Sequence, residues 1–219
     1  MGKASTTQSS VIVRDLLHLY TELLIPFMKV RRDIPFPTES ERGETDGEHA
    51  FTLSMFALTL AERMKFPLDR GLIAQYALVH DLVEAHAGDV SARSSDEALV
   101  VKVNKEREAL LVIKEQFVDK AAWIPELIAK YEARADEEAK FVYATDKLMG
   151  AFAWLAGNGE QWHLNYPEVD GAQFHFVYAR LRKKASLYPP LLDVFDKLHE
   201  QLDQAWPAYL KRVSKANGS

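Results

Sequence analysis

One stretch of the chain, residues 76–90 (YALVHDLVEAHAGDV), combines a helical pattern of apolar residues with an unusual number of ionisable side chains. Its apolar positions suit a helix that packs against a core. The ionisable residues of the stretch are His80, Asp81, Glu84, His86 and Asp89. Burying such groups is costly unless they pair with one another or bind a metal ion. The stretch therefore predicts a core helix that carries chemistry.

The rest of the chain shows helical periodicity and no strand-like alternation. Apolar residues recur at three- and four-residue spacings, as on the buried face of an amphipathic helix. The ranges expected to be helical are 13–26, 48–64, 70–87, 98–116, 123–133, 137–155, 171–186 and 190–213. We therefore expect an all-α fold of about seven to nine helices.

The same pattern predicts the organisation of the chain into one domain. We expect this domain to span residues 11–213, with its core at about 45–155 and a C-terminal helical extension after it. Short polar tails at 1–10 and 214–219 are expected to be disordered, as chain termini often are.

Composition and charge narrow the classes of function. The chain has 219 residues, of which 47% are hydrophobic and 27% charged, which is ordinary for a globular protein. It has no cysteine, which excludes disulfides, thiolate metal sites and a cysteine nucleophile. The net charge of −5 without a dense basic block argues against a nucleic-acid polymer as partner. Without a membrane-spanning run or a signal-peptide pattern, we expect a cytoplasmic protein with no membrane partner.

Four ionisable residues lie in predicted core helices where an apolar residue would be the default: His49, His80, Asp81 and Asp146. Buried separately they would destabilise the fold, but around one divalent cation they would satisfy one another. Imidazole and carboxylate groups are good ligands for Mn, Fe, Co, Ni or Zn. Two histidines and two carboxylates leave open positions for water and substrate, which is the arrangement a catalytic site needs.

Two further carboxylates accompany this group. Glu84 lies four residues after His80 and three after Asp81, on the same helix face, where it could exchange a proton with a metal-bound water. Asp89 follows Gly88 just beyond the expected helix end and could approach the same site. His86 lies on another face of the helix, and we leave it out of the site.

The longest irregular stretch, residues 29–47, precedes the first of these histidines. It contains prolines and glycines that break helices, and a loop of this length in a compact domain is often functional. Its cations are Arg31, Arg32 and Arg42.

The order His49, His80-Asp81, Asp146 resembles the H…HD…D pattern of the HD-domain metal-dependent phosphohydrolases. The resemblance is carried by four segments, GETDGEHAFTLSMFALTLAE (43–62), ALVHDLVEAHAGDV (77–90), NKEREAL (104–110) and DEEAKFVYATDKL (136–148). These cover about the middle half of the chain. Within the superfamily, the pattern is similar to that of the 5'-deoxynucleotidase-like branch.

The resemblance implies a helical HD-domain bundle with one divalent metal ion, of open identity (Mn, Co, Fe, Ni, Zn or Mg), held by the four residues named above. It implies that Glu84 supports the attacking water or the leaving group, and that Asp89 contacts the substrate sugar or fixes the geometry. It further implies phosphate release from 5'-deoxynucleoside monophosphates, and a homodimer. The branch often has an Arg-Trp pair in the loop before the first histidine. Here that loop has no Trp, which leaves Arg31, Arg32 and Arg42 as candidates for the phosphate contact.

Other activities stay open. The substrate could be a deoxynucleoside triphosphate or a diphosphate linkage, which would require a longer basic track than a monophosphate. A di-iron oxygenase would need more ligands than residues 82–145 offer, since His86 is their single histidine. A non-catalytic protein that keeps the fold is a third alternative, although a full set of candidate ligands argues against loss of the site.

Overall fold

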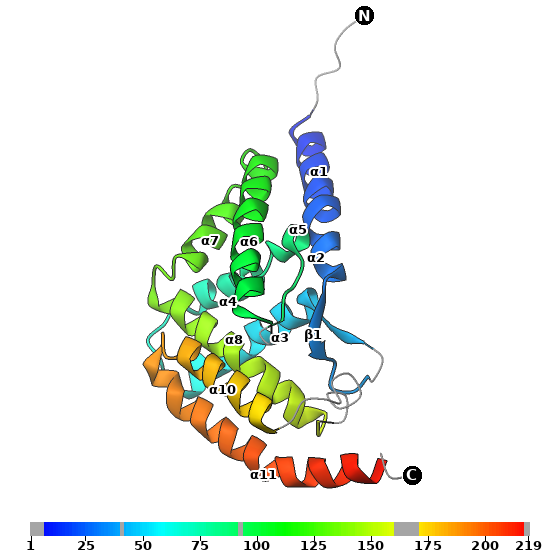
Figure 1. Ribbon diagram of the computed structural model, residues 1–219. Coiled ribbons are helices and arrows are strands. Elements are labelled where there is room, and N and C mark those ends of the chain that lie inside the picture. The colour runs from blue at the N-terminus through cyan, green and yellow to red at the C-terminus, as the bar shows by residue number, and fades with distance from the viewer. Residues whose placement is uncertain (1–6, 40–41, 92–93, 160–170, 217–219) are drawn as a thin grey trace, which may run out of the picture.

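The computed structural model describes residues 7–39, 42–91, 94–159 and 171–216. Within these residues the chain forms a bundle of helices with one small hairpin (Figure 1). In chain order the elements are α1 (Gln8–Leu19), the π-helix η1 (Tyr20–Leu24), α2 (Ile25–Lys29), β1 (Arg31–Pro35), β2 (Gly43–Thr45), α3 (Asp46–Arg63), α4 (Arg70–Val79), α5 (Glu84–Ala87), α6 (Asp96–Phe117), α7 (Trp123–Glu132), α8 (Glu137–Ala156), α10 (Gly171–Ala185), the 3₁₀-helix η2 (Pro189–Leu191) and α11 (Leu192–Ala216). The all-α prediction is confirmed.

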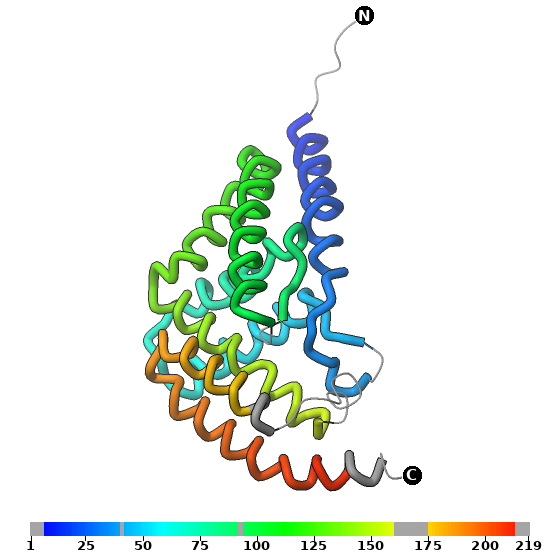
Figure 2. Tube along the Cα trace, viewed as in Figure 1, coloured from blue at the N-terminus to red at the C-terminus, as the bar shows by residue number. Residues whose placement is uncertain are grey.

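Helices α3, α4 and α8 form the centre of the bundle, where each packs against the other two. Helices α6 and α7 pack on one side, and α10 and α11 pack against α8. The first and last helices, α1 and α11, lie at opposite ends of the molecule (Figure 2). The largest fully buried side chains include Leu53, Ile73, Tyr76, Ile128, Phe141 and Leu148. No helix in the described ranges is both long and apolar enough to cross a membrane.

Helix α3 is less enclosed than its sequence suggests. Its apolar residues on most sides predict a fully central helix, yet Phe51 is 67% exposed and Met55 52% exposed. Small residues on its other face, Ala50 and Ala57, pack against the core. The helix begins with a capping box between Thr45 and Glu48, in which Thr45 is the N-cap. This frees Asp46 to lie fully buried in the first turn.

The predicted helix over 70–87 is two helices in the structure. Asp69 caps α4 by accepting hydrogen bonds from the backbone of Gly71 and Leu72. The chain leaves α4 after Val79, and tighter turns follow, such as the bond from the Glu84 nitrogen to the Asp81 oxygen (2.8 Å). These turns put His80 and Asp81 at the end of α4, and Gly88 ends α5 with a φ of 73°.

The predicted irregular stretch 29–47 contains the hairpin of β1 and β2. The two strands are antiparallel, and their paired ends are Arg31 with Thr45 and Pro35 with Gly43. The sequence did not predict these short strands, because both faces of the hairpin carry polar side chains and apolar residues do not alternate along them. The hairpin packs on α8 through β1 and so brings Arg32 toward the centre of the bundle.

Gly43 permits the close approach of the two strands. A Cβ atom at this position would lie 2.3 Å from the Arg32 carbonyl oxygen. We therefore expect Gly43→Ala to displace the strand that carries Arg32 and to lower the free energy of unfolding by about 1–3 kcal/mol. Chemical denaturation would measure the loss, with Gly150→Ala as the control, because the nearest atom to a Cβ there is 3.7 Å away. Equal stability of the two variants would contradict the expectation.

The chain ends also differ from the expected tails. Helix α1 begins at Gln8, where Thr7 caps it by accepting a hydrogen bond from the Ser10 nitrogen (3.3 Å). Residues 1–6 lie outside the described part. Pro26 does not end the first helix, because it lies in the first turn of α2, where its missing N–H is tolerated. Helix α11 continues to Ala216, three residues past the expected end at 213.

Candidate metal centre

His49 lies in the first turn of α3, with 1% of its surface exposed. Its Nδ1 is 3.2 Å from Glu44 Oε2, and its Nε2 is 2.9 Å from Asp146 Oδ1 on α8. A carboxylate only accepts hydrogen bonds, so Nδ1 donates to Glu44. In the neutral tautomer Nε2 then carries a lone pair. This lone pair faces the Asp146 carboxylate, which is also a hydrogen-bond acceptor, so the two atoms cannot form a hydrogen bond with each other. A cation between His49 and Asp146 would satisfy both.

His80, at the end of α4, is 2% exposed and shows the same pattern. Its Nδ1 lies 2.9 Å from the Ala77 carbonyl oxygen and donates to it, which leaves Nε2 as the lone-pair nitrogen. Nε2 is 2.8 Å from Asp81 Oδ2, but it is buried and has no partner in hydrogen-bond geometry among the described residues. An imidazole oriented by its other nitrogen, with its lone pair unused, is the usual state of a histidine that binds a metal.

The four candidate ligands meet from three elements. Ligand atoms of His49, His80 and Asp81 lie within 4.8 Å of one another, and Asp146 joins them through His49. Metal–nitrogen and metal–oxygen bonds of about 2.0–2.2 Å place neighbouring ligand atoms about 3 Å apart. The 2.8 and 2.9 Å separations agree with that spacing. The residues present therefore fit one divalent ion.

The charges around this group favour a cation. Burial and Arg32 lower the pKa of His49, but hydrogen bonds with Asp146 and Glu44 outweigh them and raise it to about 9. Burial would raise the pKa of Asp81, yet His80 and Arg32 hold it well below its ordinary value. The carboxylates thus keep their negative charge, and they attract a positive charge to the histidines.

Glu84, in the first turn of α5, is 1% exposed. Lys102 on α6 donates to its Oε1 at 2.7 Å, whereas its Oε2 has no hydrogen-bond partner in the described structure. Burial and the charge of Asp81 raise the pKa of Glu84 to about 10, against the lowering influence of Lys102. A buried carboxyl with a raised pKa and one oxygen that accepts no hydrogen bond is suited to proton transfer.

Asp89 does not join the candidate ligands. Its Oδ2 accepts a hydrogen bond from the Asp33 nitrogen on β1 (3.3 Å), and its Oδ1 lies 3.7 Å from Lys102 Nζ. Asp89 thereby links the hairpin to the lysine that contacts Glu84. His86 is exposed, in agreement with its exclusion from the site.

Of the three candidate arginines, one reaches the centre. Arg32 Nη1 is 2.6 Å from Asp81 Oδ2 and 3.0 Å from Asp46 Oδ1. Arg31 donates to the Gly43 carbonyl oxygen (3.2 Å), and neither it nor Arg42 lies among the residues that line the central cavity. Arg42 bonds to Glu39 and Glu48 (both 2.7 Å), so the structure does not support these two as phosphate ligands.

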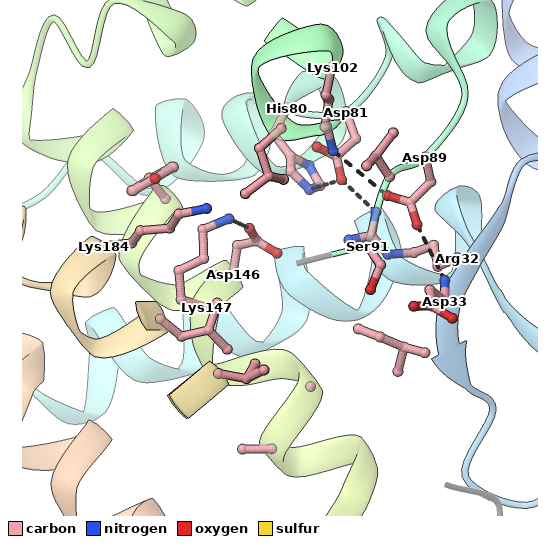
Figure 3. Close-up of a pocket in the computed structure, with 18 of the residues that line it drawn as sticks. Arg32, Asp33, His80, Asp81, Asp89, Ser91, Lys102, Asp146, Lys147 and Lys184 are labelled. Carbon is pink, nitrogen blue, oxygen red and sulfur yellow. Dashed lines mark hydrogen bonds and ion pairs between the residues drawn. The ribbon is translucent and has the colours of Figure 1, made fainter. Parts of the chain in front are cut away.

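A cavity of about 390 Å³ opens beside the candidate ligands and is lined by residues of the hairpin and of α6, α7, α8, α10 and α11 (Figure 3). Its basic side chains are Arg32, Lys102, Arg134, Lys147 and Lys184. The last four were not predicted from the sequence. Lys147 follows Asp146 directly and Lys184 belongs to a short basic run, but neither position distinguishes them from surface lysines. The C-terminal extension therefore forms part of the cavity wall.

The fold and this site define a helical domain in which histidines and aspartates from separate helices converge at a buried centre. The model of the HD-domain family matches residues 29–187, and the chain belongs to this family. Among curated proteins, none matches this sequence significantly.

Solved structures share the fold. A predicted metal-dependent phosphohydrolase from Magnetospirillum magnetotacticum is 22% identical, with a TM-score of 0.62 over 89% of this chain and 98% of that one. A conserved hypothetical protein from Pyrococcus furiosus is 19% identical, with a TM-score of 0.57 over 86% and 99% of the two chains. At these identities the likeness concerns the fold.

Proposed function

We propose that the protein is a metal-dependent phosphohydrolase that releases phosphate from small nucleotides, with 5'-deoxynucleoside monophosphates as the favoured substrates. The convergence of His49, His80, Asp81 and Asp146 at one wall of a cavity with basic residues carries the proposal. Membership of the HD-domain family and the description of the Magnetospirillum protein support it.

In this proposal the four residues would hold one divalent ion, which would act as a Lewis acid on the phosphoryl oxygens and lower the pKa of the attacking water. Glu84 would exchange a proton with the water or the leaving group through Oε2, the oxygen that accepts no hydrogen bond in the described structure and lies 3.9 Å from Arg32 Nη1. Lys102 holds the other oxygen of Glu84. Asp89 fixes the position of Lys102 relative to β1, which is the geometric role that we assign to it.

The experiment is a panel of mono-, di- and triphosphates of nucleosides and deoxynucleosides, incubated with protein loaded with Mn, Co or Mg. We expect release of inorganic phosphate from the deoxynucleoside monophosphates. A pure, metal-loaded protein that releases phosphate from no member of the panel would contradict the proposal.

Hydrolysis of a deoxynucleoside triphosphate or a diphosphate linkage is the second candidate. It is favoured by the several basic residues that line the cavity, because a longer phosphate chain needs more cations than Arg32 alone supplies. Product analysis separates the candidates, since a triphosphate substrate can yield pyrophosphate or triphosphate as well as phosphate.

We also propose that the protein is a homodimer through helix α1. Ile12 and Leu16 on α1 and Tyr20 at the start of η1 form a stripe at four-residue spacing, and each is at least half exposed. Helix α1 buries none of its own residues. An apolar stripe of this kind on a regular helix is typical of a subunit contact.

Light scattering after size-exclusion chromatography would test the dimer. We expect twice the chain mass for the wild type and the monomer mass for Leu16→Glu, because a charge at the centre of the stripe cannot be buried unpaired. The control is Glu22→Gln, a polar change on η1 after the stripe. A wild-type protein of monomer mass would contradict the proposal.

A further inference from the structure

Most cations of the cavity already have carboxylate partners. Arg32 contacts Asp81 and Asp46, and Lys102 contacts Glu84 at 2.7 Å. Neither side chain can turn fully to a substrate without leaving a buried carboxylate unpaired, which is costly. We therefore expect the phosphate-binding group to be one of the remaining basic residues of the cavity.

Lys184, on helix α10 of the C-terminal extension, differs from these cations. It lines the cavity and is partly buried, but no carboxylate of the described residues lies within ion-pair distance of its ammonium group. Burial and the nearby charge of Lys147 lower the pKa of Lys184. A partly desolvated ammonium group beside another cation is unfavourable unless an anion neutralises it.

Lys147 and Lys184 reach the same place from different helices. Figure 3 shows both side chains extending toward the space beside Asp146, Lys147 from α8 and Lys184 from α10. Lys147 is ion-paired with Asp146 through Oδ2, while Oδ1 of the same carboxylate faces His49. An anion held between the two ammonium groups would therefore lie next to the candidate metal centre.

We propose that Lys184, whose side chain lies beside Lys147, binds the phosphate group of the substrate next to Asp146. The identity of the anion as the substrate's phosphate rests on the proposed function, whereas the pair of ammonium groups is present regardless of it. Ammonium groups suit phosphate oxygens as compact point charges with three donors each. The C-terminal extension would thereby supply the phosphate contact. The sequence points instead to arginines of the loop before His49.

The neighbouring residue Lys183 provides a matched control. It is exposed and lines a more open hollow of about 480 Å³ together with Lys184, Glu132 and Arg134, but it does not line the central cavity. Substitution of Lys183 or Lys184 by glutamine removes the same charge from the same helix. Lys184 lines both the hollow and the central cavity, whereas Lys183 lines only the hollow, so the two variants separate an anion site that needs Lys184 from a general change in charge.

Calorimetric titration of the full-length protein with inorganic phosphate would test the assignment. We expect Lys184→Gln to weaken phosphate binding about tenfold or more, because a charged hydrogen bond is lost. Lys184→Arg should restore part of the affinity, and Lys183→Gln should bind as the wild type does. Equal melting temperatures of the two glutamine variants would show that folding is intact.

Three results would overturn the assignment: no phosphate binding by the wild type, unchanged binding by Lys184→Gln, or equal weakening by both glutamine variants. The measurement needs no turnover. A protein that loses phosphate affinity on Lys184→Gln but hydrolyses no nucleotide would refute the proposed function and leave the anion site in place.

Discussion

Replacement of Asp81 by alanine is expected to remove the metal ion and abolish phosphate release. The change deletes one candidate ligand, and it also leaves His80 Nε2 and Arg32 without the carboxylate that lies 2.8 and 2.6 Å from them. Metal analysis and the phosphate assay, run on the same preparation, would measure both losses. We expect metal content near zero and activity equal to that of metal-free wild type.

Loss of a buried ion-pair partner can also destabilise the fold by about 3–5 kcal/mol, so a second variant is needed. Asp81→Asn keeps the size of the side chain and one acceptor oxygen, and it should fold while still binding metal poorly. Asp119→Ala, an exposed aspartate after α6, is the control for loss of a carboxylate. Full activity in a folded Asp81 variant would refute the assignment of the ligands.

Glu84→Gln is expected to lower kcat about 10²–10⁴-fold while metal content stays near the wild-type level. The amide can still accept the hydrogen bond from Lys102, but it cannot exchange a proton with water or a leaving group. Steady-state kinetics with metal analysis would separate this outcome from that of Asp81→Ala, in which both quantities fall.

The control for Glu84→Gln is Glu108→Gln, which removes an exposed carboxylate on the neighbouring helix α6. We expect its kcat to match that of the wild type. A Glu84→Gln variant that retains wild-type kcat would show that the proton is handled elsewhere. A variant that loses its metal would instead make Glu84 part of the metal centre.

The candidate ligands could be selected from the sequence because an ionisable residue is conspicuous in an apolar helix. His49, His80 and Asp146 lie in segments whose helical periodicity is strong, and the structure brings them close together. The bounds of most helices could be predicted because their apolar residues recur at helical spacing. The break after Val79 was missed, since the residues that follow it keep the apolar spacing of a helix.

The basic residues of the site were harder to predict. Lys102 and Lys184 lie in helices rich in charged residues, where nothing local distinguishes a lysine that faces a cavity from one that faces water. Their role depends on how α6 and α10 pack against the centre, which is a property of the fold. Conversely, Arg42 appeared available in a loop, but it is engaged by Glu39 and Glu48 nearby in the chain.

Anomalous diffraction from crystals soaked in manganese tests the central claim most directly. We expect one strong peak per chain, within bonding distance of His49 Nε2, His80 Nε2, Asp81 and Asp146. Another group on the surface, His175, His199 and Asp203, also places ligand atoms within 4.8 Å of one another. A peak at that surface group alone, or none at the buried centre, would contradict the account.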